Sequence, residues 1–258
     1  MPQGIDFLIC GLEHSGTTLA SDLVRDSSCD SGFECGVLLS DSPKEFLKLE
    51  PFATNILGGW KITKDELYEC CEANSFSDFY DKLYAKSKLF KGENITKRFD
   101  KTPRYITQLS RIQDNHDVRA LALIKDPRSI AWSDFKRSKR PLSELDNWYF
   151  EWMPRKQRYM ESAYEGYLHA WDSPKECLVV RLESICLEAK NSLKIIDNFL
   201  EIPFSYNQLF FPDKRTEHTR GKSIDVSISV SWLQEMPRKM QQLISKDFER
   251  FDRWFYKF

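Results

Sequence analysis

The sequence predicts an α/β fold of three layers, in which helices cover both faces of a parallel sheet. Its apolar runs at residues 7–10, 118–124 and 177–180 are continuous and do not alternate with polar residues, which is typical of parallel strands buried on both faces. Segments with the spacing of helices lie between these runs. The chain of 258 residues is 41% hydrophobic and 14% aromatic, which suffices for one large core, so we expect a single domain over residues 1–258.

Helical segments are predicted at residues 65–90, 149–171, 187–200 and 237–256. In the second segment aromatic and large apolar side chains repeat at helical spacing, and such a stripe packs into a core far more often than it binds a cofactor. Pro154 would lie in the first turn of that helix or mark a kink. Segment 65–90 is polar and amphipathic, which indicates a peripheral position. Residues 212–225 hold few apolar side chains and a basic cluster, so we expect an exposed loop there.

Composition and charge exclude several classes of function. The net charge of −1 lacks the basic excess of a general nucleic-acid binder, so any anion site must come from local placement of Lys and Arg. The seven cysteines show no CxxC spacing, and the four histidines do not pair with cysteines at the spacing of metal ligands. We therefore expect reduced thiols and no metal site.

The start of the chain and the length of its apolar runs indicate where in the cell the protein would be found. The first predicted strand begins directly after residues 1–4, which leaves no room for a secretion signal, and no apolar run approaches membrane length. We expect a cytoplasmic protein without a membrane span.

The stretch between the first predicted strand and the next helix has the layout of a phosphate-binding loop. Gly11 and Gly16 enclose four residues, and Thr17 and Thr18 follow. Glycines let the backbone approach an anion, and the amides at a helix N-terminus point at it. The loop of nucleotide hydrolases requires Lys where this chain has Thr17. The nearest basic candidate is His14, so the loop fits a phosphate-like group better than a triphosphate.

A second candidate anion site follows the predicted strand at 118–124. Lys125 ends this strand, and Ser133 lies eight residues later, in a helix that begins near Pro127. Lys125, Arg128 and Ser133 can gather at the carboxyl end of the strand, where open α/β sheets bind ligands. A cation combined with a hydroxyl suits a dianionic phosphate. The alternative is a solvated turn followed by an ordinary surface helix.

Two further positions are candidates for chemistry. Lys101 precedes Thr-Pro, a pair that ends regular structure, so we expect it on a loop with Arg104 close behind. Glu34 stands among small and apolar residues shortly after the first helix, and a carboxylate withdrawn from water is a useful general base. The alternatives are solvated cations and a loop carboxylate exposed to water.

Together these segments resemble the sulfotransferases that use 3′-phosphoadenosine-5′-phosphosulfate (PAPS), in particular the carbohydrate and tyrosyl-protein branch. G-L-E-H-S-G-T-T-L at 11–19 resembles the family's 5′-phosphosulfate loop, and L-I-K-D-P-R-S-I-A-W-S at 123–133 resembles its 3′-phosphate segment. Three more elements follow the family's order: F-D-K-T-P-R-Y at 99–105, L-V-V-R-L-E-S-I at 178–185 and H-T-R-G-K at 218–222. The resemblance implies a fold like that of the P-loop-containing nucleotide hydrolases.

The resemblance also implies a reaction. A sulfuryl group would pass from PAPS to a hydroxyl or amine of a saccharide or small alcohol by in-line displacement, with 3′-phosphoadenosine 5′-phosphate (PAP) as the other product. Glu34 would be the general base, and His14 and Lys101 would stabilise the sulfuryl group or the departing phosphate. No metal would be needed, because the donor lacks the triphosphate charge that calls for Mg²⁺. The sequence does not indicate an oligomeric state.

The residues that would bind the donor by this resemblance are Gly11, His14, Ser15, Gly16, Thr17 and Thr18 at the 5′ end, and Lys125, Arg128, Ser133, Arg220, Gly221 and Lys222 at the 3′-phosphate. Three positions depart from the family pattern. His14 replaces Arg or Lys, so cation assistance there depends on a protonated imidazole. Lys125 replaces the more common Arg and loses its bidentate fork. Leu182 takes the usual place of Tyr, so the resemblance does not carry over the adenine contact that some members make there.

Two alternatives remain open at the level of sequence. A small-molecule kinase shares the parallel sheet and phosphate loop, and Asp126 comes closest to a Mg²⁺-holding carboxylate, although Thr17 replaces the kinase Lys. A catalytically inactive binding protein with this fold would be consistent with His14 in the loop.

Overall fold

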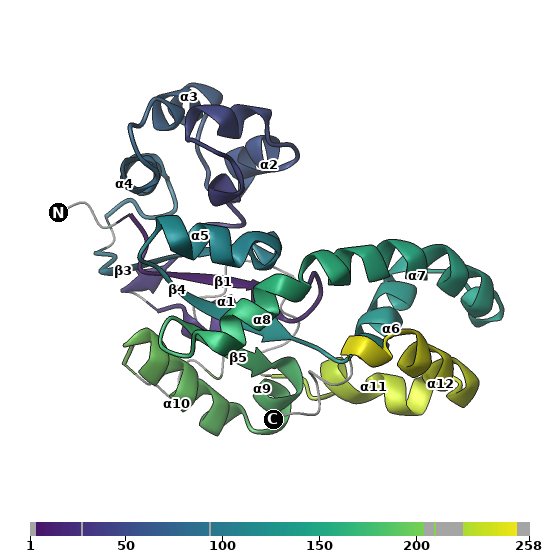
Figure 1. Cartoon of the computed structure of the whole chain (residues 1–258). Helices are drawn as coiled ribbons and strands as arrows, with labels where there is room; N and C mark the ends of the chain where they lie inside the picture. The colour runs from purple at the N-terminus through teal and green to yellow at the C-terminus, as the bar shows by residue number, and fades with distance from the viewer. Residues whose placement is uncertain (1–3, 27, 93, 204–208, 210–223, 252–258) are drawn as a thin grey trace.

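The computed structural model describes residues 4–26, 28–92, 94–203, 209 and 224–251, around a five-stranded sheet. The strands pair in parallel in the order β2-β3-β1-β4-β5 (Figure 1). They are β1 Phe7–Gly11, β2 Cys29–Asp30, β3 Lys97–Lys101, β4 Arg119–Ile124 and β5 Cys177–Arg181. The predicted α/β fold is confirmed, and the runs at 7–10, 118–124 and 177–180 correspond to β1, β4 and β5.

The helices of the described residues are α1 Thr17–Val24, α2 Phe52–Gly59, α3 Lys64–Cys71, α4 Phe76–Lys86, α5 Leu109–Asn115, α6 Pro127–Ser138, α7 Leu145–Ser162, α8 Tyr164–Asp172, α9 Leu182–Leu187, α10 Ala189–Leu200, α11 Ser227–Glu235 and α12 Arg238–Asp247. Short 3-10 turns are η1 Val37–Leu39, η2 Lys44–Lys48, η3 Pro103–Gln108 and η4 Leu142–Glu144.

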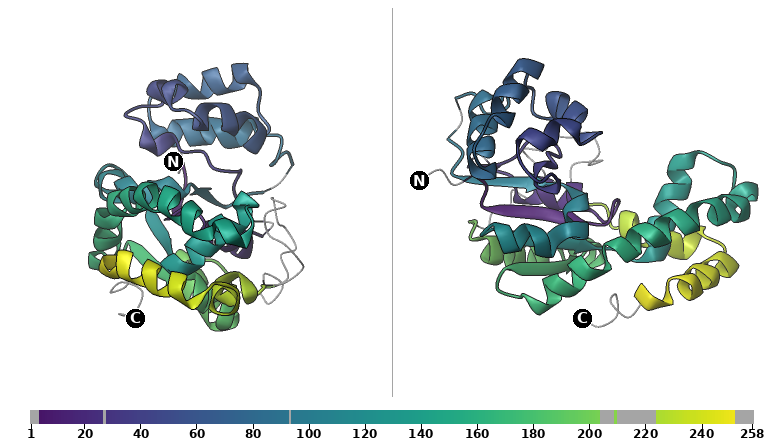
Figure 2. Two further views of the ribbon diagram at one scale, coloured as in Figure 1. Left: turned by 90° about the vertical axis from the view of Figure 1, so that its right-hand side faces the viewer. Right: turned by 45° about the horizontal axis from the view of Figure 1, so that its top comes forward.

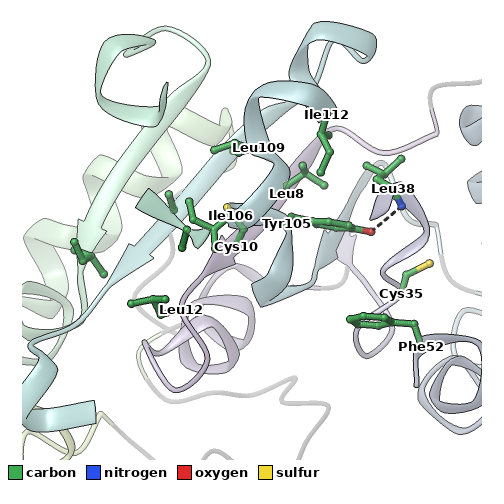
Figure 3. Packing of buried hydrophobic residues seen from close by; sticks show 14 of the residues in the cluster. Leu8, Cys10, Leu12, Cys35, Leu38, Phe52, Tyr105, Ile106, Leu109 and Ile112 are labelled. Atoms are coloured by element: carbon green, nitrogen blue, oxygen red, sulfur yellow. Dashed lines mark hydrogen bonds between the residues drawn. The ribbon is translucent and has the colours of Figure 1, made fainter. Parts of the chain in front are cut away.

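Both faces of the sheet are covered, because successive residues of β1 enter different cores. Phe7 and Ile9 pack with apolar residues of α1 and α10. Leu8 and Cys10 pack on the other side, against α5, η3 and α8. Figure 3 shows part of this second core, with Tyr105 reaching from η3 toward the Leu38 amide. A strand buried on both faces explains why its sequence is apolar without alternation.

The remaining helices extend from two sides of this layered centre. Helices α2, α3 and α4 form a group on one side of the sheet, and α6, α7, α11 and α12 pack together beyond the carboxyl ends of the strands (Figures 1 and 2). The predicted peripheral segment at 65–90 corresponds to α3 and α4. Within the described residues, no helix is both long and apolar enough to cross a membrane.

Several predicted boundaries were wrong. Segment 149–171 is two helices, α7 and α8, that meet at Ala163, and Pro154 lies inside α7 instead of in its first turn. The helix starts earlier because buried Leu145 and Trp148 extend its apolar face. The segments at 187–200 and 237–256 correspond to α10 and α12, while α9 and α11 were not predicted. Most of the loop predicted at 212–225 lies outside the described residues.

Strand β3 was also missed, and Lys101 is its last residue instead of part of a loop. The strand reads K-R-F-D-K, and its charged side chains find partners from distant parts of the chain. Arg98 pairs with Asp81 on α4, for example, with an Nη1–Oδ1 distance of 2.6 Å. A charged strand of this kind lacks the apolar run by which β1, β4 and β5 could be recognised.

Candidate active site

The loop between β1 and α1 requires both of its glycines. Gly11 has φ 145°, and a Cβ there would lie 2.3 Å from the carbonyl oxygen of Leu123 in β4. Gly16 caps α1 with φ 96°, and a Cβ there would lie 2.5 Å from Leu182 Cδ1. The loop is therefore pressed against β4 at Gly11 and against the start of α9 at Gly16, with no room for a side chain at either position.

Ser15 lies at the bottom of this loop. Its side chain is fully buried, and its hydroxyl has no hydrogen-bond partner among the described residues. Its amide donates to the Leu12 carbonyl at 3.0 Å, so the Ser15 amide is already used inside the loop. The amides of Thr17, Thr18 and Leu19, which open α1, have no intrahelical acceptor, as at every helix N-terminus. A buried hydroxyl beside such amides fits an anion-binding loop.

The loop faces a cavity of about 280 Å³ at the carboxyl ends of the strands. The described residues that line it are Glu13, His14, Gly16, Thr17, Thr18, Leu19, Phe33, Glu34, Pro103, Lys125, Ser133, Arg137 and Leu182. The cavity thus brings together residues from most of the predicted donor-binding segments.

Lys101 and Glu34 form an ion pair beside the loop. Lys101 Nζ is 2.8 Å from Glu34 Oε1 and 3.5 Å from Thr18 Oγ1, and it lies 4.1 Å from the centre of the Phe33 ring. The Lys101 side chain is 3% exposed and that of Glu34 is 27% exposed. Burial lowers the pKa of Lys101, and the Glu34 carboxylate partly opposes this shift. The pair joins an ammonium and a carboxylate at one wall of the cavity.

A buried carboxylate fixes the segment that carries Glu34. Asp100 Oδ2 accepts hydrogen bonds of 2.6 Å from the hydroxyls of both Tyr80 and Tyr105. Its Oδ1 accepts from the Thr102 hydroxyl at 2.8 Å and from the Cys35 amide at 3.3 Å. Burial raises the pKa of Asp100, and the hydroxyl donors oppose this shift. The Cys35 contact ties the residue after Glu34 to the strand that carries Lys101.

The second predicted anion site is only partly assembled. Lys125 is 1% exposed and lines the cavity with Ser133, and burial lowers its pKa to about 8. Arg128 is not among the described residues that line the cavity. Its guanidinium lies 2.5 Å from Asp126 Oδ2 and 4.2 Å from the ring centre of Trp232. The structure therefore brings Lys125 and Ser133 to the cavity and turns Arg128 toward α11.

His14 and Arg137 meet at the cavity wall. Arg137 Nη1 contacts His14 Nδ1 and lies 3.3 Å from His14 Nε2. Burial lowers the pKa of His14 to about 4, and nearby Asp134 partly opposes this shift. The imidazole is therefore neutral at neutral pH, so the cation assistance that depended on its protonation must come from other residues. Arg137 is a cation at this position that sequence reasoning missed.

A model of the sulfotransferase domain family matches residues 5–253 of the chain, nearly its whole length. The chain belongs to the sulfotransferase family. Its parallel sheet and the order of its loop segments agree with the resemblance found in the sequence. None of the curated protein sequences matches the chain.

Several solved structures share this fold, among them two sulfotransferase domains. The sulfotransferase domain from the Synechococcus PCC 7002 olefin synthase is 16% identical, with a TM-score of 0.61 and coverage of 94% of this chain and 93% of that one. The sulfotransferase domain from the curacin biosynthetic pathway is 16% identical, with a TM-score of 0.64 and coverage of 95% and 98%. Retinol dehydratase, solved with androsterone and the inactive cofactor PAP, is 15% identical, with a TM-score of 0.50 and coverage of 96% and 80%.

Arg220, Gly221 and Lys222 lie outside the described residues. Arg137 could have been found from its place four residues after Ser133, because residues at this spacing share one face of a helix. No group of three or more metal-binding side chains occurs among the described residues.

Proposed function

We propose that this sulfotransferase is an enzyme that transfers a sulfuryl group from PAPS to a hydroxyl or amine acceptor, with Glu34 as general base. The observation that carries the proposal is the Lys101–Glu34 pair, 2.8 Å between Nζ and Oε1, beside the loop that caps α1. The same cavity is lined by Lys125 and Ser133. A proton acceptor and an anion site thus share one cavity, as a group transfer between two substrates requires.

The residues of the loop fit the 5′ end of the donor. The buried Ser15 hydroxyl is without a partner among the described residues, and the cradle at Gly16 has no room for a Cβ. The opening amides of α1 and the hydroxyls of Thr17 and Thr18 would hold the 5′-phosphate, because the residues that carry them line the cavity. When bound, PAPS supplies an activated sulfuryl group whose leaving group is a phosphate.

The 3′-phosphate would be held by Lys125 and Ser133. Both residues line the cavity, and a buried ammonium beside a hydroxyl suits a dianion. Arg128 could join them only by leaving its present partners, which include Asp126, Trp232 and Ser245. Arg220, Gly221 and Lys222 remain a proposed cover for this phosphate, on the sequence pattern alone.

Glu34 and Lys101 would divide the chemistry of the transfer. Glu34 would accept the proton of the acceptor at Oε1 or Oε2, since its carboxylate is the partly exposed member of the pair. Lys101 would stabilise negative charge near Thr18, because its Nζ already lies 3.5 Å from Thr18 Oγ1. His14, neutral at neutral pH, would contribute hydrogen bonds and not a positive charge.

The acceptor is proposed as a saccharide or small alcohol, as in the carbohydrate branch that the sequence resembles.

The kinase alternative is weakened because Asp126, its candidate Mg²⁺ ligand, already has other partners. Its carboxylate caps α6 by accepting from the Arg128 amide at 2.8 Å and pairs with the Arg128 side chain, so it does not stand ready for Mg²⁺.

The first experiment is calorimetry with adenosine 3′,5′-bisphosphate, with ATP and Mg²⁺ as the comparison. Tight binding of the bisphosphate and negligible binding of ATP would support the donor site. A preference for ATP with Mg²⁺ would favour the kinase, and binding of neither would favour an inactive relative. Transfer of radiolabelled sulfate from PAPS to a panel of saccharides and alcohols then separates an enzyme from a binding protein.

A further inference from the structure

Asp134 of α6 lies at the centre of a polar cluster beside the phosphate loop. Its Oδ1 is 3.2 Å from His14 Nε2. Its Oδ2 accepts from Trp152 Nε1 at 2.9 Å and lies 3.3 Å from Lys156 Nζ. The side chains of Asp134 and Lys156 are 14% and 8% exposed. One carboxylate therefore joins the phosphate loop, α6 and α7 in a region largely withdrawn from water.

The contacts of His14 define which ring nitrogen carries the proton. Arg137 Nη1 contacts His14 Nδ1 more closely than His14 Nε2, from which it lies 3.3 Å away. A guanidinium can only donate hydrogen bonds, so this closer contact requires the lone pair of Nδ1. The proton of the neutral ring is then on Nε2, where it faces the Asp134 carboxylate. The low pKa of His14, about 4, agrees with a neutral ring.

This arrangement affects Arg137, the exposed cation at the cavity wall. An arginine side chain on a surface loses considerable rotamer freedom when it binds an anion. The contact with His14 Nδ1 holds one Nη atom of Arg137 in place, which leaves its other N–H groups for a ligand in the cavity. Lys156 Nζ lies 3.3 Å from Asp134 Oδ2 and supplies a countercharge to this largely buried carboxylate.

We propose that Asp134 is a positioning residue: by accepting a hydrogen bond from His14 Nε2–H it turns His14 Nδ1 toward Arg137, and so directs the Arg137 guanidinium at an anion in the cavity. The inference rests on the proposed function in one respect, because that function identifies the anion as the sulfuryl donor. Through this positioning, Arg137 would supply the positive charge that the family obtains from Arg or Lys at the position of His14.

The central test is a double-mutant cycle on the affinity for adenosine 3′,5′-bisphosphate. Asp134→Asn should weaken binding about tenfold in the wild-type background, as expected for loss of a charge-assisted hydrogen bond. In a His14→Ala background the same change should have an effect below about twofold, because the path through the imidazole is gone. Equal effects in both backgrounds would overturn the proposal, since a purely structural role of Asp134 does not depend on His14.

Two further variants distinguish a specific loss of affinity from a loss caused by misfolding. Asp134→Asn combined with Lys156→Met removes both charges and leaves no buried ion unpaired, and it should lose the same affinity as Asp134→Asn alone. Glu151→Gln is the matched control, because Glu151 also joins α7 to a residue just beyond α6, through Arg140 at 2.9 Å, but on the exposed surface. It should leave the affinity unchanged. If Glu151→Gln lowered the affinity for the bisphosphate as much as Asp134→Asn does, the proposal would be contradicted.

Nitrogen-15 NMR of the histidine rings provides a readout that does not require turnover or binding. We expect the wild-type His14 ring to carry its proton on Nε2, and Asp134→Asn to shift the ring toward a mixture of tautomers. A wild-type ring protonated on Nδ1 would overturn the proposal. A wild type with the expected tautomer but no affinity for the bisphosphate would instead contradict the proposed function, while supporting the role of Asp134 in orienting His14.

Discussion

Lys101 Nζ lies 2.8 Å from Glu34 Oε1, although the two residues are 67 positions apart in the chain. The ammonium is buried at the end of β3, and the carboxylate is the more exposed partner. The Glu34 carboxylate stabilises the charged form of Lys101 and so opposes the lowering of the Lys101 pKa that burial causes. Proton transfer to Glu34 would therefore free Lys101 for an anion, which couples the two proposed roles.

Replacing Glu34 by Gln should abolish most of the turnover and leave nucleotide binding intact. The amide keeps the size of the side chain but cannot accept a proton, and general-base catalysis contributes about 10²–10⁴ in rate. Turnover and calorimetric affinity for adenosine 3′,5′-bisphosphate measure the two effects. Glu13→Gln is the control, because Glu13 lines the same cavity. Near-normal turnover of Glu34→Gln would show that Glu34 is not the base.

Replacing Lys125 or Ser133 by Ala should weaken the binding of adenosine 3′,5′-bisphosphate more than that of adenosine 5′-monophosphate. Both side chains line the cavity after β4, and only the bisphosphate has the group that they are proposed to bind. We expect a difference of about 1.5–3 kcal/mol for Lys125, the range of a hydrogen bond to a charged group. Calorimetry with both ligands measures it, and Lys136→Ala on the exposed side of α6 is the control. Equal losses for both ligands would remove the 3′-phosphate assignment.

Donor affinity should fall as the pH rises through about 8. Burial lowers the pKa of Lys125 to about 8, so the free protein loses this positive charge above that pH, while the phosphate remains a dianion. Bound phosphate raises the pKa of Lys125, so binding takes up protons on the alkaline side. Lys125→Arg should remove this alkaline loss, because arginine stays charged. An unchanged pH profile in Lys125→Arg would assign the titration to another group.

Replacing Asp100 by Ala should destabilise the fold by about 3 kcal/mol, because it leaves the buried hydroxyls of Tyr80 and Tyr105 without their acceptor. It should also accelerate hydrogen exchange at the Cys35 amide, which donates to the same carboxylate. Urea denaturation and amide exchange provide the measurements. Asp114→Ala, at an exposed position on α5, should change the stability by less than about 0.5 kcal/mol. Unaltered exchange at Cys35 would mean that Asp100 does not hold the Glu34 segment.

The sequence was sufficient where the physical cause of a structure is local. Continuous apolar runs predicted β1, β4 and β5, and the glycine spacing predicted the loop from Gly11 to Gly16. It was insufficient for β3, whose charged residues are compatible with a strand only because distant partners neutralise them. The neutral state of His14 likewise depends on burial under α6 and α7. Such contacts between remote segments leave no periodic signal in a single sequence.

Replacing Gly16 by Ala should disrupt the phosphate loop for two separable reasons. The residue has φ 96°, where an L side chain is strained by about 1–3 kcal/mol, and a Cβ there would lie 2.5 Å from Leu182 Cδ1. Leu182→Ala removes the second cause but not the first. Urea denaturation of the two single variants and the double variant measures each contribution. We expect Gly16→Ala to cost less free energy of unfolding in the Leu182→Ala background, but still more than zero, and to weaken bisphosphate binding in both. If Gly16→Ala lowers the free energy of unfolding equally in both backgrounds, the backbone conformation alone requires glycine. If it has no effect in the Leu182→Ala background, the contact with Leu182 is the reason that glycine is required.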